Sequence, residues 1–260
     1  MLTGETRLSE TGLDAVALKP AECDVRRADA LSVGVVTIDY EGREHLPDVD
    51  VLAELARTKE VRLTTPVRAD GFDPLGDDSR YDEIPDGIKQ VLVAGHSAYL
   101  TAEERKRPIA PRLAAALERA PDSWVGTEGV ERIALATGGT QFDLLSRTTR
   151  RDVRALRAAG YDGELAVYAP TVLTDDEDEI LDAVGAYAAR RRPVARALPD
   201  GAATDSSATG RARKVLLAAS RDYALVGTPS AVAEQIEALR AVGVDTVVGY
   251  PARGIDEFLR

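Results

Sequence analysis

Residues 223–251 read YALVGTPSAVAEQIEALRAVGVDTVVGYP, and this stretch predicts a helix followed by a strand. Thr228 suits the N-cap, and Pro229 suits the first helical position because an N–H group there would have no partner within the helix. Gly243 ends the helix, and the β-branched run at 245–249 predicts the strand. Between the cap and the glycine an apolar stripe recurs at helical spacing, at Val232, Ile236, Leu239 and Val242. The stretch is therefore an αβ unit of the kind that builds parallel sheets.

Two more units of this kind precede it. A helix over 150–159 ends at Gly160 and leads to a strand at 164–169. Thr174 with Glu177 forms a capping box that starts another helix, which ends in three arginines before Pro193. Short apolar runs alternate with helical patterns along most of the chain, which favours a parallel sheet. The eight strand candidates are 14–18, 33–38, 61–65, 90–94, 124–126, 132–136, 164–169 and 245–249.

This succession predicts an α/β protein with the (β/α)8 TIM-barrel fold, and the expectation allows for shortened or missing N-terminal elements. The length of 260 residues fits one barrel domain over 1–260. Residues 199–210, PDGAATDSSATG after Leu198, are small, polar and aperiodic, so they are expected to form a flexible loop insertion. Residues 70–86 carry seven acidic side chains with several glycines and prolines and are expected to form a long loop.

The charge balance limits the partners of the protein. There are 33 basic and 44 acidic residues, which gives a formal charge of −11. Binding to nucleic acid or to an anionic membrane draws on clustered Lys and Arg, so neither partner is expected. Only 5 of the basic residues are lysine, and 25 of the acidic ones are aspartate. This bias is typical of proteins from salt-accumulating halophilic archaea, and a GC-rich genome that favours arginine codons is the alternative.

The beginning of the chain and its cysteine content bear on location and metals. No apolar signal region and no run of 18 apolar residues is present, so a cytoplasmic protein is expected. Cys23 is the only cysteine, which excludes an internal disulfide and a CxxC pair. With two histidines as well, a transition-metal site is not expected.

Two local motifs stand out. QVLVAGHSAY at 90–99 resembles the strand-to-nucleophile turn of α/β-hydrolases, but no histidine follows Ser97 to serve as its base, so a catalytic triad is rejected. At the end of a barrel strand, His96 would instead lie where ligand groups collect, or would be an ordinary polar loop residue. The second motif, ATGGTQ at 136–141, follows the predicted strand ERIALA. Its glycines would let backbone N–H groups approach a phosphate, although a plain turn explains them equally well.

Three stretches of the chain carry a family resemblance. Residues 50–68, 164–191 and 223–251 resemble parts of the bacterial luciferase-like superfamily, which includes the deazaflavin-dependent methylenetetrahydromethanopterin reductases. The last stretch is similar to the closing GTP-x-x-V-x-x-x-I-x-x-L-x-x-x-G-V-D pattern of that superfamily. The resemblance implies a TIM barrel and an oxidoreductase that uses deazaflavin F420 or FMN to transfer hydride to or from a small-molecule substrate. It also implies a homodimer.

The resemblance implies that several polar residues at the ends of the predicted strands belong to the active site. Asp39 and His96 would be catalytic, and Thr65 would bind the cofactor. Residues 136–140 are similar to the Ala-Thr-Gly-Pro turn of the family, and the phosphate would lie on four of them, Thr137, Gly138, Gly139 and Thr140. Arg68 and Arg253 could offset the negative charge of such a cofactor. The alternatives are a degenerate barrel with a binding or regulatory role, and an unrelated barrel enzyme for a phosphorylated metabolite.

Overall fold

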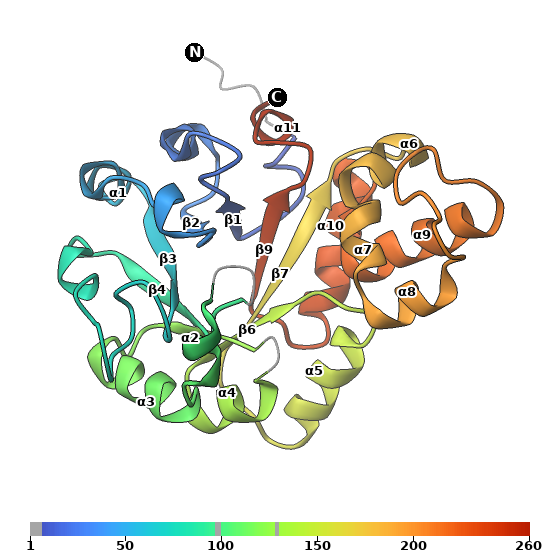
Figure 1. The fold of residues 1–260 in the computed structure, drawn as a ribbon. Coiled ribbons are helices and arrows are strands. Elements are labelled where there is room, and N and C mark those ends of the chain that lie inside the picture. The colour runs from blue at the N-terminus through green and yellow to red at the C-terminus, as the bar shows by residue number, and fades with distance from the viewer. Residues whose placement is uncertain (1–6, 97–99, 128–129) are drawn as a thin grey trace, which may run out of the picture. The chain divides into compact units, whose positions relative to one another are not determined.

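The computed structural model describes residues 7–96, 100–127 and 130–260. Its internal contacts divide the chain into two compact units. The amino-terminal unit consists of Asp14–Asp143 and Asp162–Val167. The carboxy-terminal unit consists of Met1–Leu13, Leu144–Tyr161 and Tyr168–Arg260. Figure 1 shows the chain as a ribbon with most of its helices and strands labelled.

Parallel strands form the centre of the amino-terminal unit, and each pairs with the next in chain order. Leu18 lies opposite Ile38, and Ile38 lies opposite Leu63, so apolar residues of neighbouring strands stand in one row. The strands are β1 (Ala15–Leu18), β2 (Val35–Ile38), β3 (Glu60–Pro66), β4 (Lys89–Val93), β5 (Trp124–Gly126) and β6 (Thr140–Leu144).

Helices follow these strands and pack on one face of the sheet. Leu113 and Ala116 of the third α-helix form a buried cluster with Leu92 and Val125 of the strands. This burial of apolar side chains between the two layers is what holds the helices on the sheet. The helices are η1 (Val25–Ala30), η2 (Arg43–His45), α1 (Val49–Leu55), η3 (Tyr81–Glu83), α2 (Ala102–Lys106), α3 (Ala110–Arg119) and α4 (Glu131–Thr137).

The carboxy-terminal unit continues the alternation of strands and helices. Strand β7 pairs with β8 in parallel through Thr171 opposite Leu225. Its strands are β7 (Leu165–Val172), β8 (Leu225–Val226) and β9 (Thr246–Pro251). Its helices are α5 (Thr149–Ala158), α6 (Glu177–Ile180), η4 (Leu181–Gly185), α7 (Ala186–Ala189), α8 (Arg192–Ala197), α9 (Gly210–Tyr223), α10 (Pro229–Arg240) and α11 (Asp256–Leu259).

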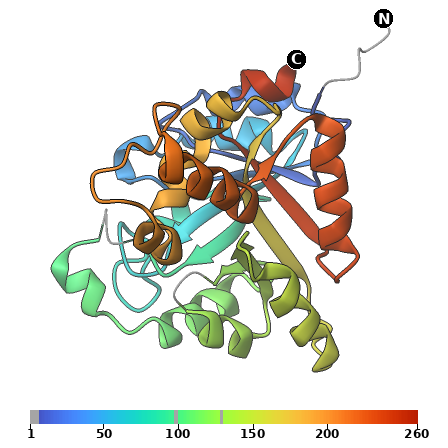
Figure 2. The same cartoon turned by 90° about the vertical axis from the view of Figure 1, so that its right-hand side faces the viewer.

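The αβ unit expected at 228–249 is present as α10 and β9, which run side by side (Figure 2). Thr228 caps the helix, since its Oγ1 accepts a hydrogen bond from the N–H of Ala231 at 3.3 Å. Pro229 is the first helical residue, and the stripe residues Val232 and Ile236 are fully buried. The caps and the spacing of the stripe therefore predict this element correctly.

The helix expected from Thr174 begins instead at Glu177, with Asp176 as its N-cap. The Asp176 carboxylate accepts hydrogen bonds from the N–H groups of Asp178 (2.9 Å) and Glu179 (3.1 Å). The predicted capping box is therefore wrong. Thr174 uses its hydroxyl to accept from the Asp176 N–H at 3.2 Å, which makes a turn ahead of the helix.

The loop between α8 and α9 lies against η4. The N–H of Ser206 donates to Asp182 Oδ1 at 2.8 Å. At Gly185 the loop approaches so closely that a Cβ there would lie 2.2 Å from the carbonyl oxygen of Thr204. Residues 199–209 thus form a loop that contacts the helix, Gly210 begins α9, and the flexibility expected of 199–210 stays a prediction.

The alternation of parallel strands and helices is that of a (β/α)8 TIM barrel, so the predicted fold class is confirmed. Seven of the eight strand candidates overlap observed strands. The candidate at 132–136 is wrong, because helix α4 occupies it and the strand β6 follows at Thr140–Leu144. ERIALA is a short apolar run, and periodicity alone does not distinguish a strand from a helix over that length.

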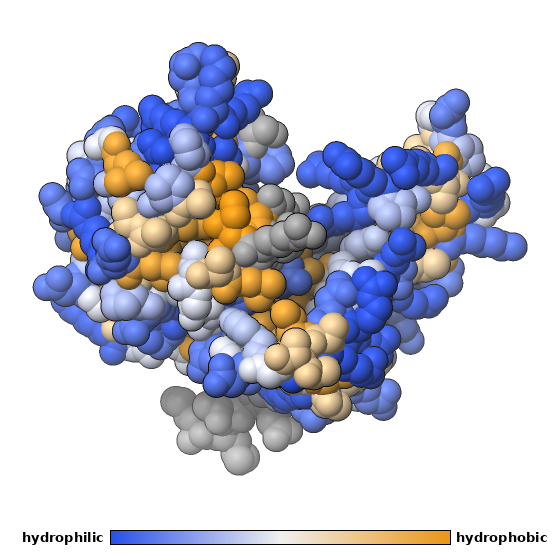
Figure 3. All heavy atoms as spheres, turned by 90° about the horizontal axis from the view of Figure 1, so that it is seen from below, coloured by the Kyte–Doolittle hydropathy of each residue, from blue (hydrophilic) through white to orange (hydrophobic). Residues whose placement is uncertain are grey.

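The surface of the described residues exposes few large hydrophobic side chains, namely Val49, Leu75 and Leu135. On the face shown in Figure 3, hydrophilic residues border the hydrophobic ones. Within the described ranges, no helix is both long and apolar enough to span a membrane.

Candidate functional site

Asp39 and His96 both lie just after parallel strands, in the amino-terminal unit. Asp39 follows β2, and its N–H donates to the carbonyl of Leu18 at 2.8 Å, which extends the ladder between β1 and β2 by one residue. Its side chain is half-buried, whereas His96, after β4, is exposed. The structure therefore places a carboxylate and an imidazole at the carboxyl ends of strands, where barrel enzymes hold their ligand groups.

Tyr40 joins this strand end to the long acidic loop. Its hydroxyl donates to the Asp70 carboxylate. The backbone of Asp70 has a φ of 53°, in the left-handed region that non-glycine residues rarely adopt. The Tyr40 ring meets Phe72 edge-on at 6.1 Å, and Phe72 meets Tyr81 in the same way at 5.8 Å. Burial raises the pKa of Tyr81, so this phenol stays neutral and its hydroxyl donates to the Phe72 carbonyl.

Arg68, after β3, fastens the loop that carries His96. Its guanidinium donates to the carbonyl oxygens of Ala94, of Gly95 at 3.2 Å and of Arg105 at 3.1 Å. These bonds direct its N–H groups at backbone carbonyls. Arg68 is therefore a positioning residue for the β4 loop, and its role in balancing cofactor charge stays a prediction.

Asp73 anchors the acidic loop from below the surface, with only 1% of the residue exposed. Its carboxylate accepts from Arg107 at 3.0 Å and from Arg112 Nε at 2.8 Å. Arg107 also donates to the Arg68 carbonyl at 2.6 Å. One buried carboxylate thus connects the loop at 70–86, the residues before α3 and the segment after β3.

Thr127 and Asp143 supply a further polar pair at the carboxyl ends of β5 and β6. The Thr127 hydroxyl donates to Asp143 Oδ1 at 2.7 Å, and its N–H donates to the Phe142 carbonyl at 3.0 Å. Asp143 is half-buried. Sequence reasoning missed this carboxylate because it placed the strand at 132–136. The alternation in TQFDL was the signal that could have located it.

Thr65 is fully buried, and its hydroxyl lies 3.3 Å from Gln90 Oε1, to which it donates. Gln90 and Leu92 share one face of β4 because they are two residues apart. Leu92 packs on helix α3 in the cluster described above. The structure therefore places Thr65 toward the helix layer and does not bring it together with Asp39 and His96.

The turn at 137–140 lies at the amino-terminal end of β6, after helix α4, and not after a strand as predicted. Thr137 donates its hydroxyl to the Ala134 carbonyl at 2.6 Å, and Gly138 is the left-handed C-cap with a φ of 73°. The amino ends of parallel strands lie at the edge opposite their carboxyl ends. Thr137, Gly138, Gly139 and Thr140 are thus apart from the other candidates, and their role in phosphate binding stays a prediction.

The remaining candidates have structural partners or lie elsewhere. Arg253 is in the carboxy-terminal unit, where it pairs with Glu179 at 2.9 Å and with Glu257 at 3.2 Å. Ser97, rejected above as a nucleophile, is outside the described residues. Across the described part of the chain, no three His, Cys, Asp or Glu side chains are grouped in a way that could hold a metal ion.

The chain belongs to a protein family described as "Family of unknown function (DUF7388)", which matches residues 8–258. A search of curated proteins found no match to this chain.

Solved structures show the class of fold. The coenzyme F420-dependent tetrahydromethanopterin reductase from Methanopyrus kandleri superposes with a TM-score of 0.61 at 15% identity, over 94% of each chain. An F420-dependent secondary alcohol dehydrogenase, solved with an F420-acetone adduct, gives a TM-score of 0.56 at 10% identity over 95% of this chain and 96% of that chain. The monooxygenase RslO1 from Streptomyces bottropensis superposes with a TM-score of 0.50 at 17% identity, over 95% of each chain. At such identities the likeness establishes the TIM-barrel fold and no more, which agrees with the fold that the resemblance implied.

Proposed function

We propose that the protein is an oxidoreductase that binds deazaflavin F420 or FMN at the carboxyl ends of the strands in its amino-terminal unit and transfers hydride to or from a small-molecule substrate. The observation that carries the proposal is the set of polar side chains at these ends, Asp39, His96 and Asp143. They occupy the end of the barrel at which enzymes of this fold act. The similarity over 94% of both chains to an F420-dependent reductase supports the same cofactor class.

The chemistry of the side chains suits such a cofactor. The pyrimidine part of the ring has carbonyl and N–H groups in alternation, and therefore needs both hydrogen-bond donors and acceptors. Asp39 and Asp143 supply carboxylate acceptors, and His96 can donate or accept. In addition, the Thr37 hydroxyl is fully buried and has no hydrogen-bond partner within the described chain. Thr37 lies two residues before Asp39, so both side chains are on one face of β2.

A bound deazaflavin or flavin would supply the hydride chemistry, and the residues of this chain would bind and orient the reactants. Asp39 would accept a hydrogen bond from a ring N–H. His96 would donate or accept a hydrogen bond through an imidazole nitrogen near the reacting groups. Arg68 would keep His96 in place through its bonds to the carbonyls of Ala94 and Gly95.

Direct titration tests the proposal. The purified chain, in high salt, is titrated with F420 and separately with FMN while the fluorescence of the cofactor is followed. We expect binding of one of them well below millimolar concentration, and about tenfold weaker binding for Asp39→Asn, the value of one lost charge-assisted hydrogen bond. Glu54→Gln, an exposed change on α1, is the matched control. If neither cofactor binds below millimolar concentration, the proposal is wrong.

The predicted phosphate turn needs its own variant. Gly138→Trp adds a large side chain at 137–140, where no atom lies within 4 Å of the position of a Cβ. Weaker cofactor binding by this variant would support the turn as a phosphate site. Unchanged binding, together with weakened binding by Asp39→Asn, would leave the strand ends as the cofactor site.

A further inference from the structure

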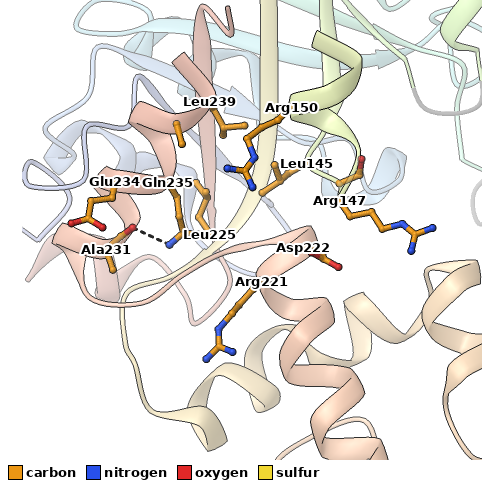
Figure 4. Close-up of a pocket in the computed structure, with 12 residues that line it drawn as sticks. Leu145, Arg147, Arg150, Arg221, Asp222, Leu225, Ala231, Glu234, Gln235 and Leu239 are labelled. Carbon is orange, nitrogen blue, oxygen red and sulfur yellow. Dashed lines mark hydrogen bonds between the residues drawn. The ribbon is translucent and has the colours of Figure 1, made fainter. Parts of the chain in front are cut away.

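A second pocket lies wholly within the carboxy-terminal unit, between helix α5, the end of α9 and helix α10 (Figure 4). Its volume is about 440 Å³, which is within the range of small-molecule sites. It shares no residue with the strand-end site proposed above. The side chains that give it its chemistry are Arg147, Arg150, Arg221, Asp222, Leu225 and Leu239.

Three arginines without carboxylate partners line this pocket. Among the residues that the structure describes, none forms a hydrogen bond or an ion pair with the side chain of Arg147, Arg150 or Arg221. Other exposed arginines of the described chain, such as Arg196, also have no such partner, so what distinguishes these three is that they line one pocket. On the same unit Arg213 is held by two carboxylates, at 2.7 and 3.0 Å.

The three arginines occupy different positions, one beside the apolar residues of the pocket and two at its margins. In Figure 4 the guanidinium of Arg150 lies beside Leu145 and Leu225, and Arg147 and Arg221 extend at its margins. All three residues are exposed, so Arg147 and Arg221 can change rotamer at low cost. Arginine presents its N–H groups in a planar fork that matches phosphate oxygens two at a time. Three exposed arginines therefore line the pocket, and the guanidinium of Arg150 is the one beside its apolar residues (Figure 4).

The rest of the lining favours a ligand that is more than a simple anion. Leu145, Leu225 and Leu239 are at most 8% exposed and give the pocket an apolar floor. Asp222 and Glu234 are exposed, and in the described chain neither has a hydrogen-bond partner for its side chain. These carboxylates can accept from hydroxyl or amino groups and would repel a ligand that was anionic throughout.

We propose that this pocket binds a phosphomonoester of nucleotide size. The phosphate lies on Arg150, with Arg147 and Arg221 closing on it. The organic body packs on the leucine floor, and its hydroxyl or amino groups donate to Asp222 and Glu234. The size of the pocket and its apolar floor favour such a molecule over an extended polyanion.

Calorimetric titration with adenosine monophosphate, and with adenosine as the matched probe without phosphate, tests the proposal. Titrations are run at the lowest salt at which circular dichroism shows the wild type to be folded, and again in molar salt. We expect adenosine monophosphate to bind at millimolar concentration or better, adenosine at least tenfold more weakly, and the difference to shrink in molar salt as charges are screened. No binding of adenosine monophosphate, or equal binding of the two probes, would overturn the proposal.

Variants then locate the site. Arg150→Gln and Arg221→Gln should each weaken the binding of adenosine monophosphate severalfold, and the double variant at least tenfold. Arg196→Gln removes an exposed arginine of α8 that is not part of the pocket, and should leave the affinity unchanged. If the double variant binds as tightly as the wild type, the phosphate lies elsewhere and the proposal fails.

The probe also separates this site from the proposed cofactor site. FMN is itself a phosphomonoester and is therefore not used here. A chain that binds adenosine monophosphate but not F420, and that binds FMN no more weakly after Asp39→Asn, would support this pocket and refute the proposed function. A chain that binds F420 and not adenosine monophosphate would support the proposed function and refute this pocket as a phosphomonoester site.

Discussion

Asp73 is a single residue on which the order of the acidic loop depends. It accepts hydrogen bonds from Arg107 at 3.0 Å and Arg112 at 2.8 Å and also from the N–H of Leu75 at 3.0 Å. Asp73→Asn keeps the size of the side chain but turns an amide NH2 group toward an arginine. We expect the free energy of unfolding to fall by about 3 kcal/mol, the usual effect of breaking a buried ion pair on one side. Urea denaturation of the wild type and of the variant measures this difference in the free energy of unfolding.

Asp86→Asn is the control for this change, because Asp86 is exposed in the same loop. It should shift the free energy of unfolding by less than about 0.5 kcal/mol. An equally small shift for Asp73→Asn would show that the ion pairs of Asp73 with Arg107 and Arg112 make no net contribution to the free energy of unfolding.

Glu257 makes stability depend on pH in a direction opposite to that of most carboxylates. Burial raises the pKa of Glu257 above its ordinary value of about 4.5, and outweighs the hydrogen bond from the Leu173 N–H and the charge of Arg253. The folded chain therefore holds this proton more tightly than the unfolded chain does. Between the ordinary pKa and the raised one, this group lowers the free energy of unfolding as the pH rises.

Glu257→Gln removes this titration while keeping an oxygen that can accept from Leu173. The stability of the variant relative to the wild type should therefore increase from pH 4 to pH 7.5, as measured by urea denaturation at several pH values. The contribution of Glu257 is fully present when it is protonated, so the two proteins should be most alike at the acid end. A difference that is constant or that shrinks with rising pH would contradict the raised pKa.

The turn between α4 and β6 is the element whose glycine the backbone requires. Gly138 has a φ of 73°, and no atom lies within 4 Å of the position of a Cβ, so a side chain there meets conformational strain and no clash. Gly138→Ala should lower the free energy of unfolding by about 1 kcal/mol, the cost of a left-handed residue with a Cβ. Gly138→Asn should cost less, because asparagine tolerates this conformation. Thermal denaturation of the two variants measures the order, and equal costs would contradict the explanation.

The same elements show what sequence patterns can predict. Thr228, Pro229 and the stripe beginning at Val232 are local signals, and the helix they predict is present. ERIALA carries no such signal, since one apolar run of this length suits either a strand or a helix. The error displaced the following strand, and with it the recognition of Asp143 as a strand-end residue.

In the candidate site too, residues marked by local sequence patterns could be predicted, and roles that depend on tertiary contacts could not. Asp39 and His96 were predicted because each directly follows a recognisable strand. The part played by Arg68 was not predictable in this way, because its bonds reach carbonyls 26 to 37 residues away in the chain. Thr65 was misplaced for another reason, since the face of the strand on which a residue lies depends on the register with β4.

At the scale of the whole molecule, the charge of −11 makes electrostatic repulsion a property of the surface rather than of one site. Ion pairs offset part of this repulsion, as where Arg119 joins Asp78 and Asp82 at 2.8 Å each. Exposed pairs of this kind contribute little each, and salt weakens them. Added salt therefore has two opposed effects, weaker pairs and weaker repulsion, and the excess of acidic residues decides which is larger.

We therefore expect the melting temperature to rise as potassium chloride is added to a salt-free solution. Screening should produce most of the rise at low concentration, because the Debye length falls from about 30 Å at 0.01 M to about 3 Å at 1 M. Sucrose at matched molarity is the control, since it is excluded from protein surfaces without screening charge. A melting temperature unchanged between near-zero and molar potassium chloride would favour codon bias in a GC-rich genome as the origin of the lysine-poor composition. A steep initial rise that sucrose does not reproduce would instead identify the acidic surface as an adaptation to salt, because only screening of repulsion acts in that concentration range.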